Sequence, residues 1–182
     1  MFTASEKKRE NIAEYLLYMW QIEDLIRANN LDIDKIQNSI IDSYTALDDN
    51  KKKELRDWYE SLVDMMKREG VAEKGHLQLN KNTLIQLNDL HRRLLSDSKF
   101  ADYAAEFYKT LPYIVELRAK AGENKADEIE TCFNALYGLL MLRLAKKEIS
   151  QDTVDASRQI SRFLALLSKY YKMDYNNELF EE

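Results

Sequence analysis

Apolar side chains recur at intervals of three and four residues along most of this chain, which is the spacing that places them on one face of an α-helix. Polar stretches containing asparagine, glycine or serine separate these periodic segments. We therefore expect about seven helices, which span roughly residues 5–28, 32–47, 49–69, 82–97, 98–121, 125–147 and 150–172. The pattern predicts an all-α fold.

Two of these segments are apolar on every side rather than on one face. The first helix carries YLLYMW at residues 15–20, and the sixth carries CFNALYGLLML at residues 132–142. A helix that is apolar all round has to be surrounded by other helices. We therefore predict a bundle in which the helices at about 5–28 and 125–147 are central and the five amphipathic helices pack around them.

The clearest interruption of the pattern is GVAEKGHLQLNKNT, residues 70–83, which holds two of the four glycines and is predicted to be a loop. Either it separates two domains or it is a long loop within one. Neither side has enough chain to cover apolar faces this wide, so we predict one bundle domain over residues 1–173 and an acidic tail at 174–182. Pro112 lies inside the fifth helix, and the sequence leaves open whether it kinks this helix near Thr110 or splits it in two.

Composition supports the helical prediction. The 182 residues include only four glycines and one proline, with 32% charged and 45% hydrophobic residues, and strand-rich folds need more turn residues than that. A chain of this length buries about 70% of the surface that its unfolded state exposes. It therefore needs no disulfide or metal to close a core.

Charge and cysteine use exclude several classes of partner. The net charge is -5 and no segment is strongly basic, so we expect no nucleic-acid partner. The longest uncharged run, Thr131–Leu142, has twelve residues, whereas a membrane-spanning helix needs about 20, so we expect no membrane partner. The N-terminus lacks the long apolar region of a signal peptide, and the single Cys132 fits a reducing cytoplasm.

No catalytic motif, metal-ligand set or cofactor fingerprint is present in the sequence. The Glu-x-x-His spacing of di-iron bundles occurs once, from Glu73 to His76, and Gly75 interrupts it within the predicted loop. The chain has only two histidines, which excludes a three-histidine metal site. We therefore predict no catalytic residues, no metal and no cofactor, and the sequence favours a protein that is not an enzyme without deciding the question.

The end of the first helix is the best candidate for a ligand site. Glu23 and Asp24 follow its apolar stretch after Gln21 and Ile22. Glu23 and Arg27 are either a solvated ion pair, since they lie four residues apart, or part of a cleft. His91 lies among leucines on the fourth helix and is either a hydrogen-bonded core histidine or a ligand contact. The candidate ligand-binding residues are Tyr18, Trp20, Glu23, Asp24, Arg27 and His91.

Residues 9–30, RENIAEYLLYMWQIEDLIRANN, resemble the N-terminal signature of an uncharacterised bacterial family of small all-helical proteins, classed as a domain of unknown function. The length and the later helical segments are similar to this family too, so the resemblance covers nearly the whole chain. It implies a bacterial cytoplasmic protein with a single all-helical domain. It implies no activity and supplies no catalytic residues.

Three functions compete on these observations. The leading hypothesis is a non-enzymatic cytoplasmic bundle that acts through contact with an unknown protein partner or as a homodimer, since an excess of amphipathic helices leaves apolar surface for a partner. The alternative is a bundle that binds or transforms a small molecule in a pocket near the C-terminal end of the first helix. A helix-turn-helix regulator fits the helix count, but the early helices are acidic, which is wrong for DNA binding.

Overall fold

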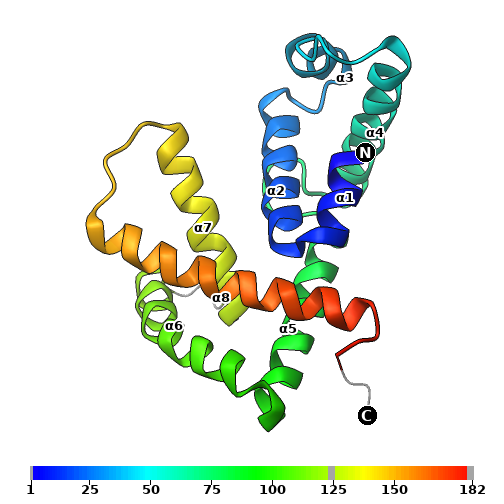
Figure 1. Ribbon diagram of the computed structural model, residues 1–182. Helices are drawn as coiled ribbons and strands as arrows, with labels where there is room; N and C mark the ends of the chain where they lie inside the picture. Colours follow the sequence, from blue (N-terminus) through cyan, green and yellow to red (C-terminus); the bar gives the residue numbers. More distant parts are fainter. Residues whose placement is uncertain (1, 123–125, 180–182) are drawn as a thin grey trace. The chain divides into compact units, whose positions relative to one another are not determined.

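The structure, a computed structural model, describes residues 2–122 and 126–179 and confirms the all-α fold class (Figure 1). No strand occurs within these two ranges. Besides α-helices there are a π-helical segment, η1, and a short 3-10 helix, η2. The elements are α1 Phe2–Glu10, α2 Ile12–Ala28, α3 Ile33–Ile36, η1 Gln37–Ile41, α4 Asp49–Arg68, α5 Gln78–Ser96, η2 Ser98–Phe100, α6 Ala101–Lys120, α7 Glu128–Leu144 and α8 Gln151–Tyr175.

The chain folds as two compact units. Unit 1 contains the residues up to Lys8 together with Glu14–Asn82, and unit 2 contains Arg9–Ala13 together with the residues from Thr83 onward. The boundary in mid-chain falls inside α5, so this helix begins in unit 1 and continues in unit 2. A single domain over residues 1–173 stays a prediction.

The first predicted helix is two helices, which corrects the single helix expected at 5–28. α1 ends at Glu10 and α2 begins at Ile12. Between them, the side-chain oxygen of Asn11 accepts a hydrogen bond from the N–H of Ala13 at 3.1 Å, which is how an asparagine starts a helix. The same N–H donates to Oγ of Ser168 at 3.3 Å, and this contact ties the short segment between α1 and α2 into unit 2.

α2 is buried over most of its surface, as its apolar sequence predicts. Leu16, Trp20 and Ile26 are at most 1% exposed, and Leu17 is half-buried. The helix ends at the predicted residue 28, and Asn30 beyond it adopts a left-handed backbone conformation with a φ of 57°. α2 therefore supplies much of the core of unit 1.

The second predicted helix is shorter than expected. Asp32 caps α3 by accepting hydrogen bonds from two backbone N–H groups, and the helical stretch ends with η1 at Ile41 instead of residue 47. α4 then follows the prediction closely and packs against α3 and η1. Its C-terminal end is closed by Gly70, which has a φ of 69° that a side chain would strain.

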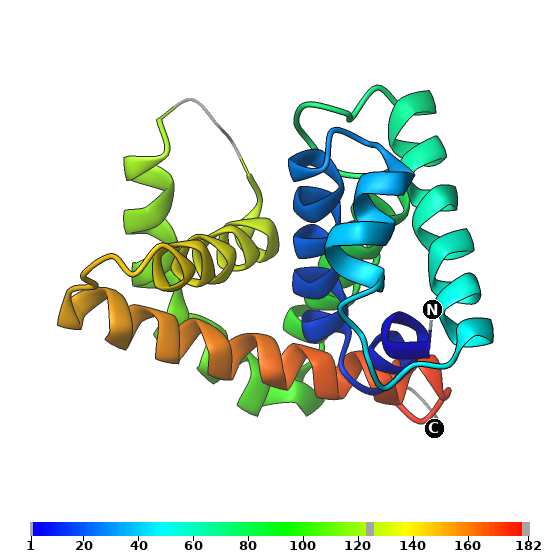
Figure 2. The same cartoon turned by 90° about the horizontal axis from the view of Figure 1, so that it is seen from above.

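α8 organises unit 2. Oγ of Ser150 accepts a hydrogen bond from the N–H of Thr153 at 3.3 Å and caps the helix. α6 and α7 both pack against α8 and against each other, and Figures 1 and 2 show them lying along it. α8 continues to Tyr175, which takes it into the predicted tail at 174–182, whose last three residues lie outside the described ranges.

α6 runs through Pro112 as one helix, so the alternative of two separate segments is wrong. The turn before the proline is held by side chains. Thr110 donates from Oγ1 to the carbonyl of Glu106 at 2.8 Å, and Gln159 of α8 donates to both of these residues. A kink near Thr110 stays a prediction.

α7 is enclosed along its first half and uncovered at its end. Asp127 caps it by accepting a hydrogen bond from the N–H of Glu130 at 2.8 Å; the predicted start at 125 lies outside the described residues. Phe133 is fully buried, whereas Leu142 and Leu144 are 41% and 66% exposed. The predicted enclosure on all sides is therefore wrong for the last turns, because α6 and α8 flank this part of α7 without covering it.

Candidate functional site

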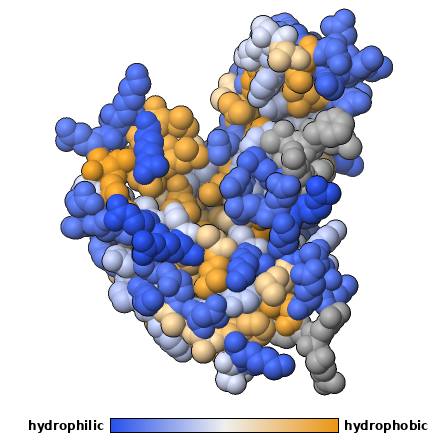
Figure 3. Space-filling model, viewed as in Figure 1, coloured by the Kyte–Doolittle hydropathy of each residue, from blue (hydrophilic) through white to orange (hydrophobic). Residues whose placement is uncertain are grey.

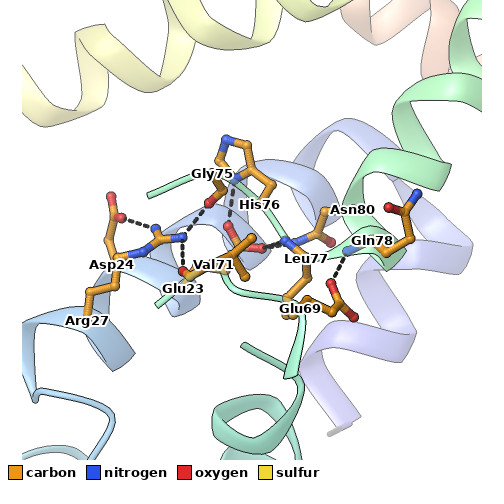
Figure 4. A network of polar contacts seen from close by, with 10 residues as sticks. All are labelled: Glu23, Asp24, Arg27, Glu69, Val71, Gly75, His76, Leu77, Gln78 and Asn80. Atoms are coloured by element: carbon orange, nitrogen blue, oxygen red, sulfur yellow. Dashed lines mark hydrogen bonds and ion pairs between the residues drawn. The ribbon is translucent and has the colours of Figure 1, made fainter. Parts of the chain in front are cut away.

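The carboxylate of Glu23 is the centre of a buried polar cluster in unit 1. Glu23 lies near the C-terminal end of α2 and has no exposed surface. Its Oε1 accepts hydrogen bonds from the N–H of Leu77 at 2.9 Å and from the side-chain amide of Asn80 at 2.6 Å. Its Oε2 lies 2.6 Å from Nδ1 of His76 (Figure 4). A buried carboxylate is tolerated because such donors replace water.

His76 is fixed by two contacts at once. Its Nδ1 and Oε2 of Glu23 share one hydrogen bond. The imidazole is also stacked on the indole of Trp20, with ring centroids 4.2 Å apart and an angle of 14° between the planes. Its side chain keeps 28% of its surface exposed, and Figure 4 shows the second ring nitrogen directed away from Glu23.

Arg27 binds the loop one turn further along α2. Its guanidinium lies 2.7 Å from Oδ1 of Asp24 and donates to the backbone carbonyls of Val71, at 3.2 Å, and Gly75. The solvated ion pair between Glu23 and Arg27 is therefore wrong, since Asp24 is the partner of Arg27 and Glu23 faces inward. An arginine has five donors in a planar fork, which suits it to joining a side chain and two carbonyls.

The cluster fastens the loop at residues 71–77 and the start of α5 to α2. Besides the contacts of Glu23 and Arg27, Oε2 of Glu69 accepts a hydrogen bond from the N–H of Gln78 at 2.6 Å, at the first residue of α5. This contact explains why α5 begins at residue 78 rather than at the predicted 82. Both carboxylate oxygens of Glu23 are hydrogen-bonded within the protein itself. The cluster therefore holds this loop in place and orients the imidazole of His76.

Four of the six predicted ligand residues lie together on the second half of α2. Trp20, Glu23 and Arg27 contact the loop at residues 71–77, and Asp24 is bound to Arg27. Tyr18 is half-buried beside Tyr44 and Tyr59, and burial followed by the charge on Tyr44 raises its pKa. A ligand site made by all six residues stays a prediction.

His91 belongs to the aromatic core of unit 2. It is 5% exposed, and its Nδ1 lies 2.7 Å from the hydroxyl of Tyr103. The ring meets Phe107 edge-on at 4.8 Å. Burial is the main cause that lowers the pKa of His91. The charges of Glu128 and Asp127 raise this pKa, but less than burial lowers it, and the charge of Arg92 lowers it further. This is the arrangement of a hydrogen-bonded core histidine.

Sequence reasoning missed the partners of Glu23. The pattern singles out His76 only as a potential metal ligand, and it does not single out Asn80. A signal was present, because Glu23 lies four residues after Met19 and three before Ile26 on a face that is buried. A carboxylate there must find donors from another segment, and a loop with polar residues follows α4.

A groove of about 680 Å³ lies between α6, α7 and α8, entirely within unit 2. None of the six candidate ligand-binding residues lines this groove. Its apolar lining consists of Tyr113, Leu117, Ala135, Gly138, Leu139, Leu142, Ala156 and Ile160, and its polar lining of Glu116, Lys120, Asn134, Ser150, Asp152, Thr153, Asp155 and Ser157. A second groove of about 390 Å³ between α7 and α8 shares Leu139 and Ser157 with the first. Hydrophobic surface gathers over α7 in Figure 3.

In the part of the chain that the structure describes, no helix combines the length and hydropathy needed to cross a membrane. Over the same residues, no three side chains of His, Cys, Asp or Glu are placed together as metal ligands would be.

Comparison with known proteins places the chain in a family. A family model described as a domain of unknown function (DUF4924) matches residues 1–178. No curated protein and no solved structure matches the chain. Because the match spans nearly the whole sequence, including the segment at residues 9–30 and every described helix, the chain belongs to the family DUF4924, a domain of unknown function.

Proposed function

We propose that this chain acts by binding another protein, and that the contact is made by a surface of unit 2. The surface consists of Leu136, Leu140, Leu142 and Leu144 with the adjoining 680 Å³ groove, and we call it the α7 face. The observation that carries the proposal is the exposure of Leu142, which lines this groove, and of Leu144 at the end of the same helix.

Exposed leucines are costly to leave in water. Covering one large apolar side chain contributes about 1.5–3 kcal/mol, and single scattered leucines need no explanation. Here Leu142 lines the larger groove, and Leu136 and Leu140, which are only half-buried, line the neighbouring groove of about 390 Å³. Apolar surface next to a concavity is typical of a protein-binding site.

The alternative is a small-molecule or enzymatic site at the C-terminal end of α2. One observation favours it, namely the imidazole of His76, which is held by Glu23, stacked on Trp20 and still partly exposed. A buried carboxylate that orients a histidine is an arrangement used in catalysis. We rank it second because both carboxylate oxygens of Glu23 and one guanidinium nitrogen of Arg27 are bonded to the loop and the start of α5.

A cytoplasmic location is part of the same proposal. The single cysteine, Cys132, is a buried free thiol in α7, which suits a compartment where thiols stay reduced. Fractionation of the host cell tests this part, and recovery of the chain outside the cytoplasm contradicts it.

The experiment is affinity purification of the tagged full chain from its host after mild cross-linking, with partners identified by mass spectrometry. Leu142→Glu is compared with Leu25→Glu on α2, because both leucines are 41% exposed. We expect a partner that is recovered with wild type and with Leu25→Glu and is lost with Leu142→Glu. Partners that Leu142→Glu retains in full, or the absence of any other protein together with a chain that stays monomeric, would contradict the proposal.

A further inference from the structure

We infer that the protein bound at the α7 face is a second copy of this chain, related to the first by a two-fold axis. The inference rests on the proposed function, because it names the partner of the same surface. It is carried by two neighbouring features of unit 2, a groove with an acidic rim and a helix end that is both apolar and basic.

The rim of the groove is acidic. Three carboxylates and one lysine line it. The lysine, Lys120, lies 2.6 Å from Glu116, and Asp155 is 2.9 Å from Arg158. Asp152, in the first turn of α8, has no partner among the residues described. The groove therefore offers an apolar floor bordered by an unpaired negative charge.

The end of α7 has the complementary character. Residues 139–147, LLMLRLAKK, contain no acid and three bases. Neither Arg143, Lys146 nor Lys147 forms an ion pair within the described part of the structure. Their backbone is fixed at the helix end, because the N–H of Lys147 donates to the carbonyl of Leu142 at 3.0 Å. An apolar segment with fixed basic flanks is what an apolar groove with an acidic rim would bind.

The two features adjoin each other, and this favours a copy of the same chain. Leu142 lines the groove and also belongs to the apolar helix end. A two-fold axis passing near Leu142 lets each helix end enter the groove of the other copy, so one operation forms both contacts. Near the axis, Leu142 of one copy meets Leu142 of the other. Further from the axis, Lys146 of one copy approaches Asp152 of the other, and groups of like charge are thereby kept apart.

The experiment is sedimentation velocity of the full chain from about 1 to 500 µM, a range that covers weak and moderate affinities. We expect a monomer–dimer equilibrium in wild type. Leu142→Glu should raise the dimer dissociation constant about tenfold or more, since it places a charge at the centre of the contact. Leu25→Glu, at equal exposure on α2, should leave it unchanged. Circular dichroism confirms that each variant is folded.

A charge exchange keeps the inference falsifiable even if the leucine variants unfold. Asp152→Lys and Lys146→Glu should each weaken the dimer, and the double variant should restore it. A wild-type chain that stays monomeric throughout, or a double variant no tighter than either single one, overturns the inference. If the chain is monomeric and a different protein is recovered from the host and lost with Leu142→Glu, the dimer is wrong and the proposed function stands. If no partner is recovered either, both fail.

Discussion

His76 and Glu23 are 53 positions apart in the sequence, yet Nδ1 of His76 lies 2.6 Å from Oε2 of Glu23. Glu23 is fully buried, and its other oxygen accepts two further hydrogen bonds from Leu77 and Asn80. A loop without regular structure is thus fixed to a helix by one carboxylate. The stability of unit 1 should depend strongly on this carboxylate.

We expect Glu23→Leu to destabilise the protein by about 3–5 kcal/mol, because buried donors of the loop lose their acceptor. Glu23→Gln keeps the acceptor for Leu77 and Asn80 and should cost only about 1–2 kcal/mol. Urea unfolding measures both. Asp24→Asn is the control, since this exposed pair with Arg27 should contribute less than about 1 kcal/mol. Equal losses for Leu and Gln at position 23 would show that the hydrogen bonds are unimportant.

Acid should weaken unit 2 through His91. Its folded pKa is lowered from 6.5, mainly by burial, so the unfolded chain binds the proton more readily. The contribution of neutral His91 is therefore fully present above about pH 6.5 and is lost as the pH falls toward the lower folded value. His91→Gln removes the titration and keeps a hydrogen-bonding group near Tyr103. Between pH 7.5 and 5.0 we expect wild type to lose more stability than His91→Gln, and parallel losses would refute the assignment.

Two glycines should respond to alanine in opposite directions. Gly138 lies inside α7 with no atom within 4 Å of an added Cβ, so Gly138→Ala should stabilise by about 0.5–1 kcal/mol. Gly70 also has room, but its φ is 69°, so Gly70→Ala should destabilise by about 1–2 kcal/mol. Thermal unfolding of the two variants tests the pair. The same sign for both would mean that backbone conformation does not decide the outcome.

Cys132 should be unreactive in the folded protein. Burial, followed by the charges of Asp127 and Glu128, raises the pKa of its thiol to about 12, and the thiolate is the reactive form. In the native protein at pH 8, we expect iodoacetamide to label Cys132 only as fast as the protein unfolds. In urea, we expect the labelling to be immediate. Ser161→Cys on the exposed side of α8 supplies a reactive control. Rapid labelling of native Cys132 would be inconsistent with its burial.

Periodicity predicted the helical class and most helices because one apolar face is a local property of the sequence. α4, α8 and the end of α2 lie close to their predicted ranges, and their caps at Asp48, Ser150 and Asn30 are also local signals. The break at Asn11 was missed because the apolar pattern continues across it. A single hydrogen bond to Ala13 decides it.

The features that the sequence did not predict are determined by tertiary contacts. Glu23 and Arg27 have an ideal spacing for a helical ion pair, but hydrogen-bond donors of the loop and of the start of α5 bind Glu23 instead. The second predicted helix stops at Ile41, although its apolar stripe continues to Tyr44. The groove was invisible to pattern analysis, since it depends on how far α6 and α8 extend along α7. Exposure of Leu142 and Leu144 follows from the reach of those neighbours rather than from the composition of α7.

The hydrogen bond from Ala13 to Ser168 joins positions 155 residues apart and bears on how the protein is assembled during synthesis. All of the residues of unit 1 emerge from the ribosome before most of unit 2, and chains begin to fold from the N-terminus as they emerge. Ala13 therefore cannot donate this hydrogen bond until α8 has been synthesised. Closing a loop of this length carries a cost in conformational entropy that the packing of α8 has to outweigh.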